Sequence, residues 1–292
     1  MWGFLNVNKP SGMTSHDVVA SVRRGLGIKK VGHAGTLDPM ASGVLLLCVG
    51  AATRLSEYVT QTTKRYQGRV HLGATTDTYD ADGMVRQERD ASAIRREDVE
   101  RALAAFRGDI EQVPPMYSAI KQEGRKLYKL ARAGQTVERE ARPVTIQHLE
   151  IVDWSPPQVT LDVVCSAGTY IRSLAYDLGE ALGVGAYLAG LARVASGSFT
   201  IDNAITLDTL LSAESWQPYL IPVQTALAGW PVVHLDEVGV EDIRHGRMVI
   251  DEAAAGDKLA LAFAPDGDFV AVIKAETGKW QPEKVFLPEN LS

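Results

Sequence analysis

The sequence predicts an α+β protein in two parts, a body over residues 1–229 and a small β-rich domain over residues 230–292. Strand patterns and helical stripes alternate irregularly in the body, without the regular repeat of a parallel α/β sheet. After residue 229 the pattern changes to short apolar runs around turns. The charge divides at the same point, because residues 230–292 hold twelve acids against six bases and so carry the whole net charge of −6. The body is therefore neutral, and an acidic total does not exclude a nucleic-acid partner.

Length and composition are those of an ordinary globular chain. With 292 residues, 46% of them hydrophobic and 23% charged, the chain can bury a sizeable core. No apolar run approaches the roughly 18 residues of a membrane-spanning helix, and the N-terminus lacks the pattern of a secretory leader. Cys48 and Cys165 lie far apart in apolar runs. We therefore expect two buried thiols in a protein of the reducing cytoplasm.

The first elements of the body have clear boundaries. Gly3–Val7 has the pattern of a strand. Thr14–Asp17 forms a capping-box pattern for a helix that Gly25 or Gly27 ends. Val44–Val49 is an unbroken apolar run, which is typical of a strand buried on both faces.

Later segments repeat these signals. A helical stripe begins near Arg96 and stops at Gly108. Val159–Cys165 alternates as a strand does, and a helix begins at Ile171, with Thr169 as its N-cap and Gly183 at its end. Beyond residue 229, the apolar runs 259–263 and 269–273 flank a Pro-Asp-Gly turn and predict a hairpin.

Basic residues gather in one stretch of the body. Between Tyr117 and Thr145 there are seven bases against three acids. Because screening confines each charge to about 10 Å, such a local patch matters more for phosphate binding than the total charge. Solvated helix faces remain the alternative interpretation.

The least ordinary segment is Gly32–Leu45, in which three glycines, a proline, a histidine and Asp38 precede a buried strand. Such a loop can present a carboxylate rigidly, although a turn whose aspartate accepts backbone hydrogen bonds is an alternative. The run from Asp80 to Gly83 suggests a calcium loop, but Arg89 stands where the bidentate glutamate belongs. No dinucleotide or phosphate-loop fingerprint is complete, so we expect neither a cofactor nor a metal.

Several segments together resemble the TruB family of pseudouridine synthases. The loop Gly32–Pro39 is similar to the family's catalytic loop. The likeness continues, in family order, over roughly residues 3 to 200. The other matching segments are Phe4–Ser15, Lys64–Tyr66, Leu72–Asp80, Gln112–Lys121 with Gly124, Tyr128, Ala131 and Arg132, and Gly168–Leu174.

The resemblance implies the family's fold and reaction. The fold has a mixed, mainly antiparallel central sheet flanked by helices, with a PUA-like C-terminal domain. The reaction isomerises uridine 55 in the tRNA T-loop to pseudouridine, by base flipping, cleavage of the glycosidic bond and rejoining through C5. The segment Gln112–Lys121 and its continuation resemble the stand-alone bacterial enzyme, so a monomer without guide RNA is expected. Its partner is the T-arm of tRNA, and contact of the C-terminal domain with the acceptor stem is left open.

The resemblance also assigns roles at the reaction centre. Asp38 matches the carboxylate nucleophile, whether it attacks the sugar or the base, and Arg172 matches its cationic partner. Tyr66 matches the tyrosine that stacks on the target base and is the candidate for C5 proton removal. Tyr170 and Leu191 match residues that line the uracil pocket. An ordinary exposed arginine is the alternative for Arg172.

Further residues match positions that contact the RNA. His33 resembles the residue that takes the place of the flipped base in the stacked T-loop. Lys9 and Lys64 are expected on the pocket floor or at phosphates, against a purely structural role. The expected backbone contacts are Lys121, Arg125, Lys129, Arg132 and Arg193, all but the last in a basic insertion over about residues 117–142. Ala192 stands where many relatives have arginine, which puts one phosphate contact in doubt.

Two other functions stay open at this point. The first is a tRNA-binding folding helper, in which binding is the main role. The second is a guide-dependent rRNA pseudouridine synthase, since relatives of that kind share the aspartate loop.

Overall fold

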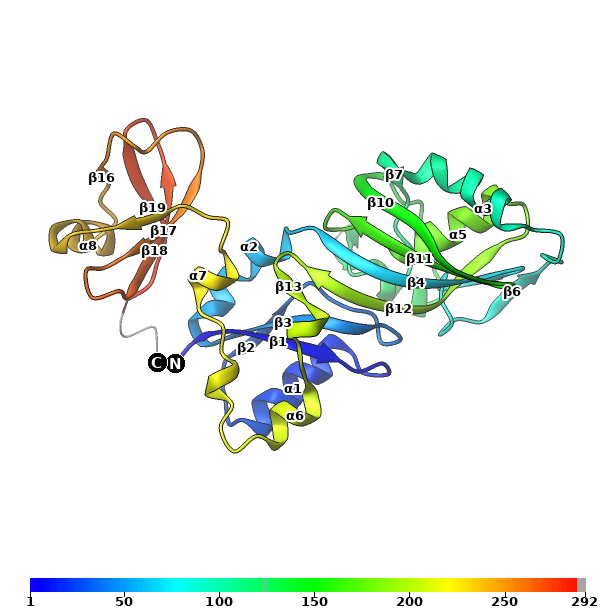
Figure 1. Cartoon of the computed structure of the whole chain (residues 1–292), viewed down its shortest axis with the longest axis horizontal. Coiled ribbons are helices and arrows are strands. Elements are labelled where there is room, and N and C mark those ends of the chain that lie inside the picture. Colours follow the sequence, from blue (N-terminus) through cyan, green and yellow to red (C-terminus); the bar gives the residue numbers. More distant parts are fainter. Residues whose placement is uncertain (123, 288–292) are drawn as a thin grey trace.

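The structure is a computed structural model that describes residues 1–122 and 124–287. One ten-stranded sheet forms the body, with the order β14-β1-β3-β12-β4-β11-β10-β7, while β2 pairs with β3 and β13 with β12 (Figure 1). Its strands are β1 (Gly3–Lys9), β2 (Val31–Ala34), β3 (Ser42–Val49), β4 (Lys64–Leu72), β7 (Gly108–Gln112), β10 (Arg142–Ser155), β11 (Gln158–Cys165), β12 (Ala186–Ser196), β13 (Phe199–Thr200) and β14 (Ile205–Thr206). Two pairings are parallel, β1 with β14 and β3 with β12, and the others are antiparallel. The prediction of a mixed, mainly antiparallel sheet is confirmed.

A second sheet of five strands forms the β-rich C-terminal part, in the order β15-β17-β18-β19-β16. Its strands are β15 (Val232–His234), β16 (Val249–Ile250), β17 (Leu259–Phe263), β18 (Phe269–Ala275) and β19 (Lys279–Val285). The predicted hairpin is confirmed as the antiparallel pair β17–β18. Two short hairpins lie outside both sheets: β5 (Ala74–Thr76) with β6 (Val85–Glu88), and β8 (Lys121–Gln122) with β9 (Arg125–Lys126).

The helices are short. They are α1 (Ser15–Gly25), α2 (Ser56–Thr60), α3 (Arg96–Leu103), α4 (Leu127–Arg132), α5 (Ile171–Ala181), α6 (Leu207–Ser212), α7 (Val223–Ala226) and α8 (Glu237–Arg244), with single 3₁₀ turns at Gly50–Leu55, Ala104–Phe106, Ile201–Asn203 and Gln217–Tyr219. Within the described residues, no helix is long and apolar enough to cross a membrane.

The predicted start signals of α1 and α5 had different outcomes. The capping box at Thr14 is confirmed, because its hydroxyl accepts from the Asp17 N–H and the Asp17 carboxylate accepts from the Thr14 N–H. The N-cap of α5 was wrongly predicted. It is Tyr170, because the Thr169 hydroxyl donates instead to the Ser166 carbonyl.

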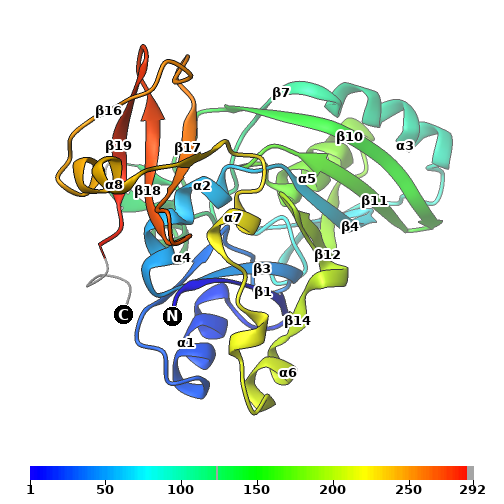
Figure 2. The same ribbon diagram turned by 60° about the vertical axis from the view of Figure 1, so that its left-hand side comes forward.

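One face of the large sheet is covered by helices α1, α6, α3 and α5, which share a single core with it (Figures 1 and 2). Alternation along β3 separates the two faces, since Leu45 and Leu47 belong to this core and Val44 and Leu46 to the core on the other side. The predicted burial of β3 on both faces is confirmed.

The second core joins the body to the C-terminal domain. Trp2 stacks on Phe286 with ring centroids 5.5 Å apart, and the Arg54 guanidinium lies 4.5 Å from the same ring. Lys284 forms an ion pair with Glu57 beside them. The C-terminal domain therefore packs against the β1–β3 end of the sheet, away from β10 and β11 (Figure 1).

Candidate active site

Asp38 lies on the loop that connects β2 to β3. The Ser15 hydroxyl at the start of α1 accepts from the Leu37 N–H at 2.8 Å and donates to the Leu37 carbonyl. On the other side of Asp38, the Gly12 N–H donates to the Pro39 carbonyl at 2.8 Å. The loop is thus held immediately before and after the aspartate, whose side chain is 34% exposed.

Arg172 in the first turn of α5 pairs with this carboxylate. Its Nε lies 2.9 Å from Asp38 Oδ2, and its Nη2 donates to Asp38 Oδ1 at 3.1 Å. The Thr78 carbonyl accepts from Nη1 at 3.2 Å, and the Tyr117 carbonyl accepts from Nη2 at 3.0 Å. The alternative of an exposed arginine is wrong, because the side chain is only 5% exposed. The guanidinium is therefore fixed by three separate segments of chain.

A second carboxylate, Asp80, completes the ion-pair group. Its Oδ2 lies 3.4 Å from Arg172 Nη1, and its side chain is 5% exposed. Burial raises the pKa of Asp80, while the Thr78 hydroxyl and Arg172 oppose the shift. In the sequence, Asp80 stands at the end of the matching segment Leu72–Asp80 and in an incomplete calcium loop, and neither pattern predicts its pairing with Arg172.

Tyr66, Leu191 and Tyr170 lie around the ion pair. Tyr66 is 8% exposed and faces the helix-covered side of β4. Burial raises its pKa, which the nearby Arg193 guanidinium partly opposes. Leu191 on β12 pairs with Gly68, the second residue after Tyr66 along β4. Any side chain at Gly68 would press on Ile171, since its Cβ would lie 3.2 Å from Ile171 Cγ2, so the glycine lets α5 approach the sheet.

Gln112 at the end of β7 holds Tyr170, a role not predicted from the sequence, in which Gln112 only begins the matching segment Gln112–Lys121. Its amide donates to the Tyr170 carbonyl at 3.0 Å and accepts from the Tyr170 N–H at 2.7 Å. This clamp replaces the missing side-chain cap of α5 and joins the base of the insertion to the helix that carries Arg172. A cavity of about 450 Å³ lies beside it, between Gln112, Ile120, Arg142 and Tyr170.

His33 on β2 is half-buried close to His16 and Arg193. Burial, and secondarily these two groups, lowers its pKa, so its imidazole is neutral at neutral pH. Its Nδ1 is buried without a hydrogen-bond partner among the described residues. A neutral ring at the edge of the site is suited to stacking on a base.

Lys9 and Lys64 are placed differently from the substrate contacts expected of them. The Lys9 side chain is fully buried, and its ammonium donates to the carbonyls of Pro10, Met13 and Pro39. The Lys64 ammonium donates to Thr60 and Thr62. Burial lowers the pKa of both lysines to about 8. Both ammonium groups are occupied by protein oxygens and are not free to bind a phosphate. The structure therefore supports a purely structural role for the two lysines, which was the alternative to RNA contact.

Arg193 also departs from its expected role at the RNA backbone. It is 1% exposed, and its guanidinium donates to the carbonyls of Val44 and Gly35. A side chain enclosed in this way cannot contact a phosphate, so the expectation of an RNA-backbone contact is wrong for Arg193.

The basic side chains of the insertion are exposed to solvent. Lys121, Arg125, Lys129 and Arg132 are all exposed on the short hairpin β8–β9 and on α4. Met116, Leu127 and Leu130 form a small core beneath them. The segment therefore carries a separate basic surface, and its base reaches the site through the Tyr117 carbonyl on Arg172.

Comparison with known proteins identifies the family. The family model described as "TruB family pseudouridylate synthase (N terminal domain)" matches residues 23–171. The chain belongs to the TruB family. Two further models of this family, "tRNA pseudouridylate synthase B C-terminal domain" and "tRNA Pseudouridine synthase II, C terminal", match residues 172–228 and 230–287. The predicted resemblance is confirmed, and the protein is a pseudouridine synthase, an isomerase.

Relatives in the TruB family align over most of the chain. A protein of Dehalococcoides mccartyi named tRNA pseudouridine synthase B is 41% identical over 99% of this chain and 98% of its own length. One of the same name from Pseudomonas aeruginosa is 48% identical over 85% of this chain and 83% of its own. A solved Cbf5-Nop10-Gar1 complex contains a chain with TM-score 0.75 and 28% identity, over 99% of this chain and 86% of that one. The fold class is thereby confirmed.

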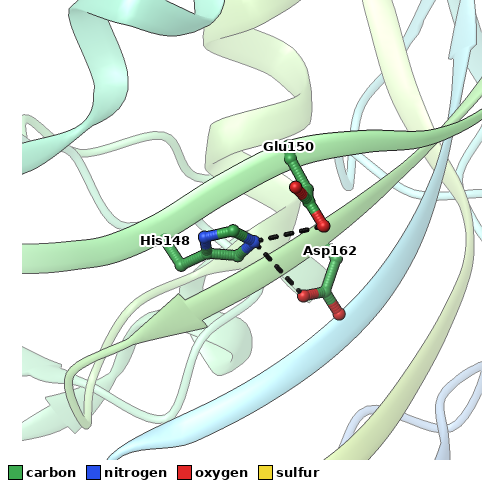
Figure 3. A group of neighbouring side chains, drawn as sticks. All are labelled: His148, Glu150 and Asp162. Carbon is green, nitrogen blue, oxygen red and sulfur yellow. Dashed lines mark ion pairs between the residues drawn. The ribbon is translucent and has the colours of Figure 1, made fainter.

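One polar cluster on the body of this TruB-family chain lies apart from the site. His148 and Glu150 on β10 and Asp162 on β11 project from the face that the helices leave open, and His148 Nε2 lies 3.3 Å from Glu150 and 3.7 Å from Asp162 (Figure 3). Arg65 Nε already pairs with both oxygens of Asp162 at 3.0 and 3.1 Å. Because Arg65 already pairs with the buried carboxylate of this cluster, the cluster does not argue for a metal.

Proposed function

We propose that this protein isomerises uridine 55 in the T-loop of tRNA to pseudouridine as a stand-alone enzyme. The observation that carries the proposal is the Asp38–Arg172 ion pair, with one carboxylate partly exposed beside the rings of Tyr66 and Tyr170. The reaction moves no atoms in or out of the substrate overall. It therefore needs a fixed carboxylate, a surface for the detached base and a route for one proton.

Asp38 begins the proposed chemistry as an ionised carboxylate, and Arg172 keeps it in that state. The N1–C1′ bond breaks, with Asp38 adding to the nucleotide or stabilising the fragment. The base turns, and its C5 bonds to C1′, with release of the Asp38 carboxylate from any bond that it has formed to the nucleotide. C5 then loses its proton and N1 gains one, so that atoms and charge balance.

Tyr66 has two proposed roles. Its ring stacks on the uracil, which is worth roughly 1–3 kcal/mol per base and tolerates the rotation of the base. It is also the proposed acceptor of the C5 proton. Because burial raises the pKa of Tyr66, the phenol is neutral at pH 7 and must pass on its own proton as it accepts that of C5.

RNA recognition is assigned to the body. Phosphates of the T-arm are contacted by the exposed basic side chains of the insertion, which are Lys121, Arg125, Lys129 and Arg132. His33 stacks where the flipped base has left, which offsets part of the few kcal/mol that flipping costs. The C-terminal domain carries the net charge of −6 and is assigned at most a local contact.

Relatives named tRNA pseudouridine synthase B support tRNA as the substrate. The structural neighbours include a chain from an "H/ACA RNP bound to a substrate RNA", which keeps guide-dependent action as the second candidate. Sequence identity favours the first, at 41–50% against 26% for the chain from that particle. Buried, unpaired Cys48 and Cys165 fit the proposed cytoplasmic setting.

The test uses the purified protein and two unmodified RNAs, a whole tRNA transcript and a T-arm hairpin, each carrying tritium at C5 of uridine. Pseudouridine formation releases that tritium to water. We expect release from both RNAs without guide or protein partner, and loss of it when uridine 55 is replaced by cytidine. No release without guide RNA would favour the guide-dependent candidate. Faster tRNA folding without tritium release would favour the folding helper.

A further inference from the structure

Arg193 is a buried cation to which the proposed chemistry assigns no role. It belongs to a row across four neighbouring strands, in which Lys9 pairs with Gly43, Gly43 with Arg193, and Arg193 with Tyr66. Residues opposite one another in a sheet project to the same face, which here is the face of the Asp38 loop. The row is therefore the floor beneath that loop.

The guanidinium grips the loop at both of its ends. Nη2 donates to the Gly35 carbonyl at 2.8 Å, three residues before Asp38. Nε donates to the Val44 carbonyl at 2.7 Å, six residues after it. The rigid, planar guanidinium thus fixes the distance between the end of β2 and the start of β3, which are the two ends of the Asp38 loop.

Gly43 makes this close approach possible. Its φ is +102°, and a Cβ there would lie 2.2 Å from the Arg193 carbonyl oxygen, so any side chain would force β3 and β12 apart. A Cβ on Gly35 would lie 3.3 Å from Arg193 Nη1. The loop backbone is therefore packed directly on the arginine.

Among the described residues, no carboxylate neutralises the positive charge of Arg193, which acts on the neighbouring groups of the site. Within the described chain, its guanidinium donates to two backbone carbonyls and forms no ion pair with a carboxylate, although burying a cation without such a partner is costly. Its nearest titratable neighbours on the surrounding elements are Lys9, His33, Lys64 and Tyr66, each of whose pKa it lowers. Among these, only Tyr66 becomes anionic when it gives up a proton, so the cation favours proton release from that phenol.

We propose that Arg193 is a positioning residue that sets both groups of the reaction, the Asp38 loop through its two carbonyls and the Tyr66 hydroxyl through its charge. This role rests on the proposed isomerisation, and it replaces the RNA contact expected from the sequence. If this is so, Arg193→Lys, which keeps the charge but lacks the planar guanidinium, slows the chemical step without weakening RNA binding.

The test compares Arg193→Lys and Arg193→Gln with Arg69→Lys, a control on an exposed arginine of β4. Single-turnover conversion of the T-arm hairpin gives a rate constant and an amplitude, and filter binding gives Kd. The amplitude counts correctly folded molecules, so partial unfolding does not hide the rate constant. We expect both Arg193 variants to lose about 10- to 100-fold in rate constant, with Kd within about twofold of the wild type, and Arg69→Lys to match the wild type.

Three outcomes overturn the proposal. An unchanged rate constant with a reduced amplitude, or no active fraction in either variant, makes Arg193 a residue of fold stability alone. A weaker Kd with a smaller salt dependence makes it a phosphate contact. A rate constant and amplitude that both equal the wild type give it no role. Inactivity of the wild type itself would contradict the proposed function instead, so the two failures are distinguishable.

Discussion

Arg172 and Asp38, 134 positions apart in the chain, meet with Nε 2.9 Å from Oδ2. The two partners are unequally buried, at 5% exposure for the arginine and 34% for the aspartate. The cation is therefore fixed within the protein while the carboxylate keeps an accessible edge. This asymmetry suits the proposed function, in which Asp38 meets a flipped nucleotide as an ionised carboxylate.

Replacing Arg172 by lysine tests the planar geometry of this pair. A lysine ammonium cannot serve Asp38, the Thr78 carbonyl and the Tyr117 carbonyl at once, because it lacks the flat fork of the guanidinium. We expect the single-turnover rate to fall about 100-fold, with RNA affinity nearly unchanged. The matched control is Arg101→Lys on the exposed side of α3. A variant that converts RNA at the wild-type rate would show that charge alone suffices.

Asp80→Asn tests the second carboxylate of the group. The substitution preserves shape but removes the charge that faces Arg172 Nη1 at 3.4 Å. The guanidinium then loses one of its anchors, and we expect the rate of conversion to fall about 10-fold while Kd stays constant. Asp82→Asn, two residues along and exposed, serves as the control. Equal effects of the two substitutions would argue against a specific role for Asp80.

The insertion predicts a measurable dependence on salt. Changing Lys121, Arg125 and Lys129 to alanine removes three exposed charges. If each contacts one phosphate, the slope of log Kd against log salt decreases by about 2 to 3. The control changes Lys258, Lys274 and Lys279 of the acidic domain, where we expect the slope to stay the same. An unchanged slope in the first variant would remove the insertion from the RNA interface.

Asp177 on α5 predicts a pH-dependent stability. Burial, and secondarily Glu180, raises its pKa from 3.8 to about 6. Well below pH 3.8 the carboxyl is protonated in both folded and unfolded chains, and above pH 6 the folded chain carries a costly charge, so stability falls between these values. Asp177→Asn removes that loss. After allowance for solvent screening, we expect a gain of about 1–2 kcal/mol at pH 8 and a much smaller gain at pH 4.

Thermal unfolding at the two pH values checks this prediction. The melting temperature should rise by a few degrees at pH 8 and by much less at pH 4. Asp257→Asn is the control, because its carboxyl is 92% exposed. A gain of equal size at pH 4 would mean that the change acts through packing rather than ionisation.

Local patterns correctly predicted elements such as β3, α1 and the β17–β18 hairpin, because capping boxes, glycines and strand alternation act over a few residues. They did not single out β10 or β12. The RNA contacts expected of Lys9, Lys64 and Arg193 depend on whether the charged end of each side chain reaches solvent or is buried. A sequence marks a basic residue but not the carbonyls that enclose it, so Arg193 was placed at the RNA instead of beneath Gly35 and Val44.

The partners of Arg172 illustrate the same limit. The pairing with Asp38 was implied by resemblance and is now seen as geometry. Asp80 was not recognised because its burial arises only when the loop after β5 folds against α5. Gln112 was not recognised either, since a glutamine that clamps a backbone has no signature in sequence.

The central claim is that Asp38 performs the chemistry, and one measurement tests it most directly. Single-turnover tritium release from the T-arm hairpin is compared between the wild type and Asp38→Asn, with Kd measured for both proteins. We predict no detectable release by Asp38→Asn and a Kd within about threefold of the wild type, because the amide keeps the shape and cannot act as a nucleophile. Release by Asp38→Asn at the wild-type rate would contradict the account.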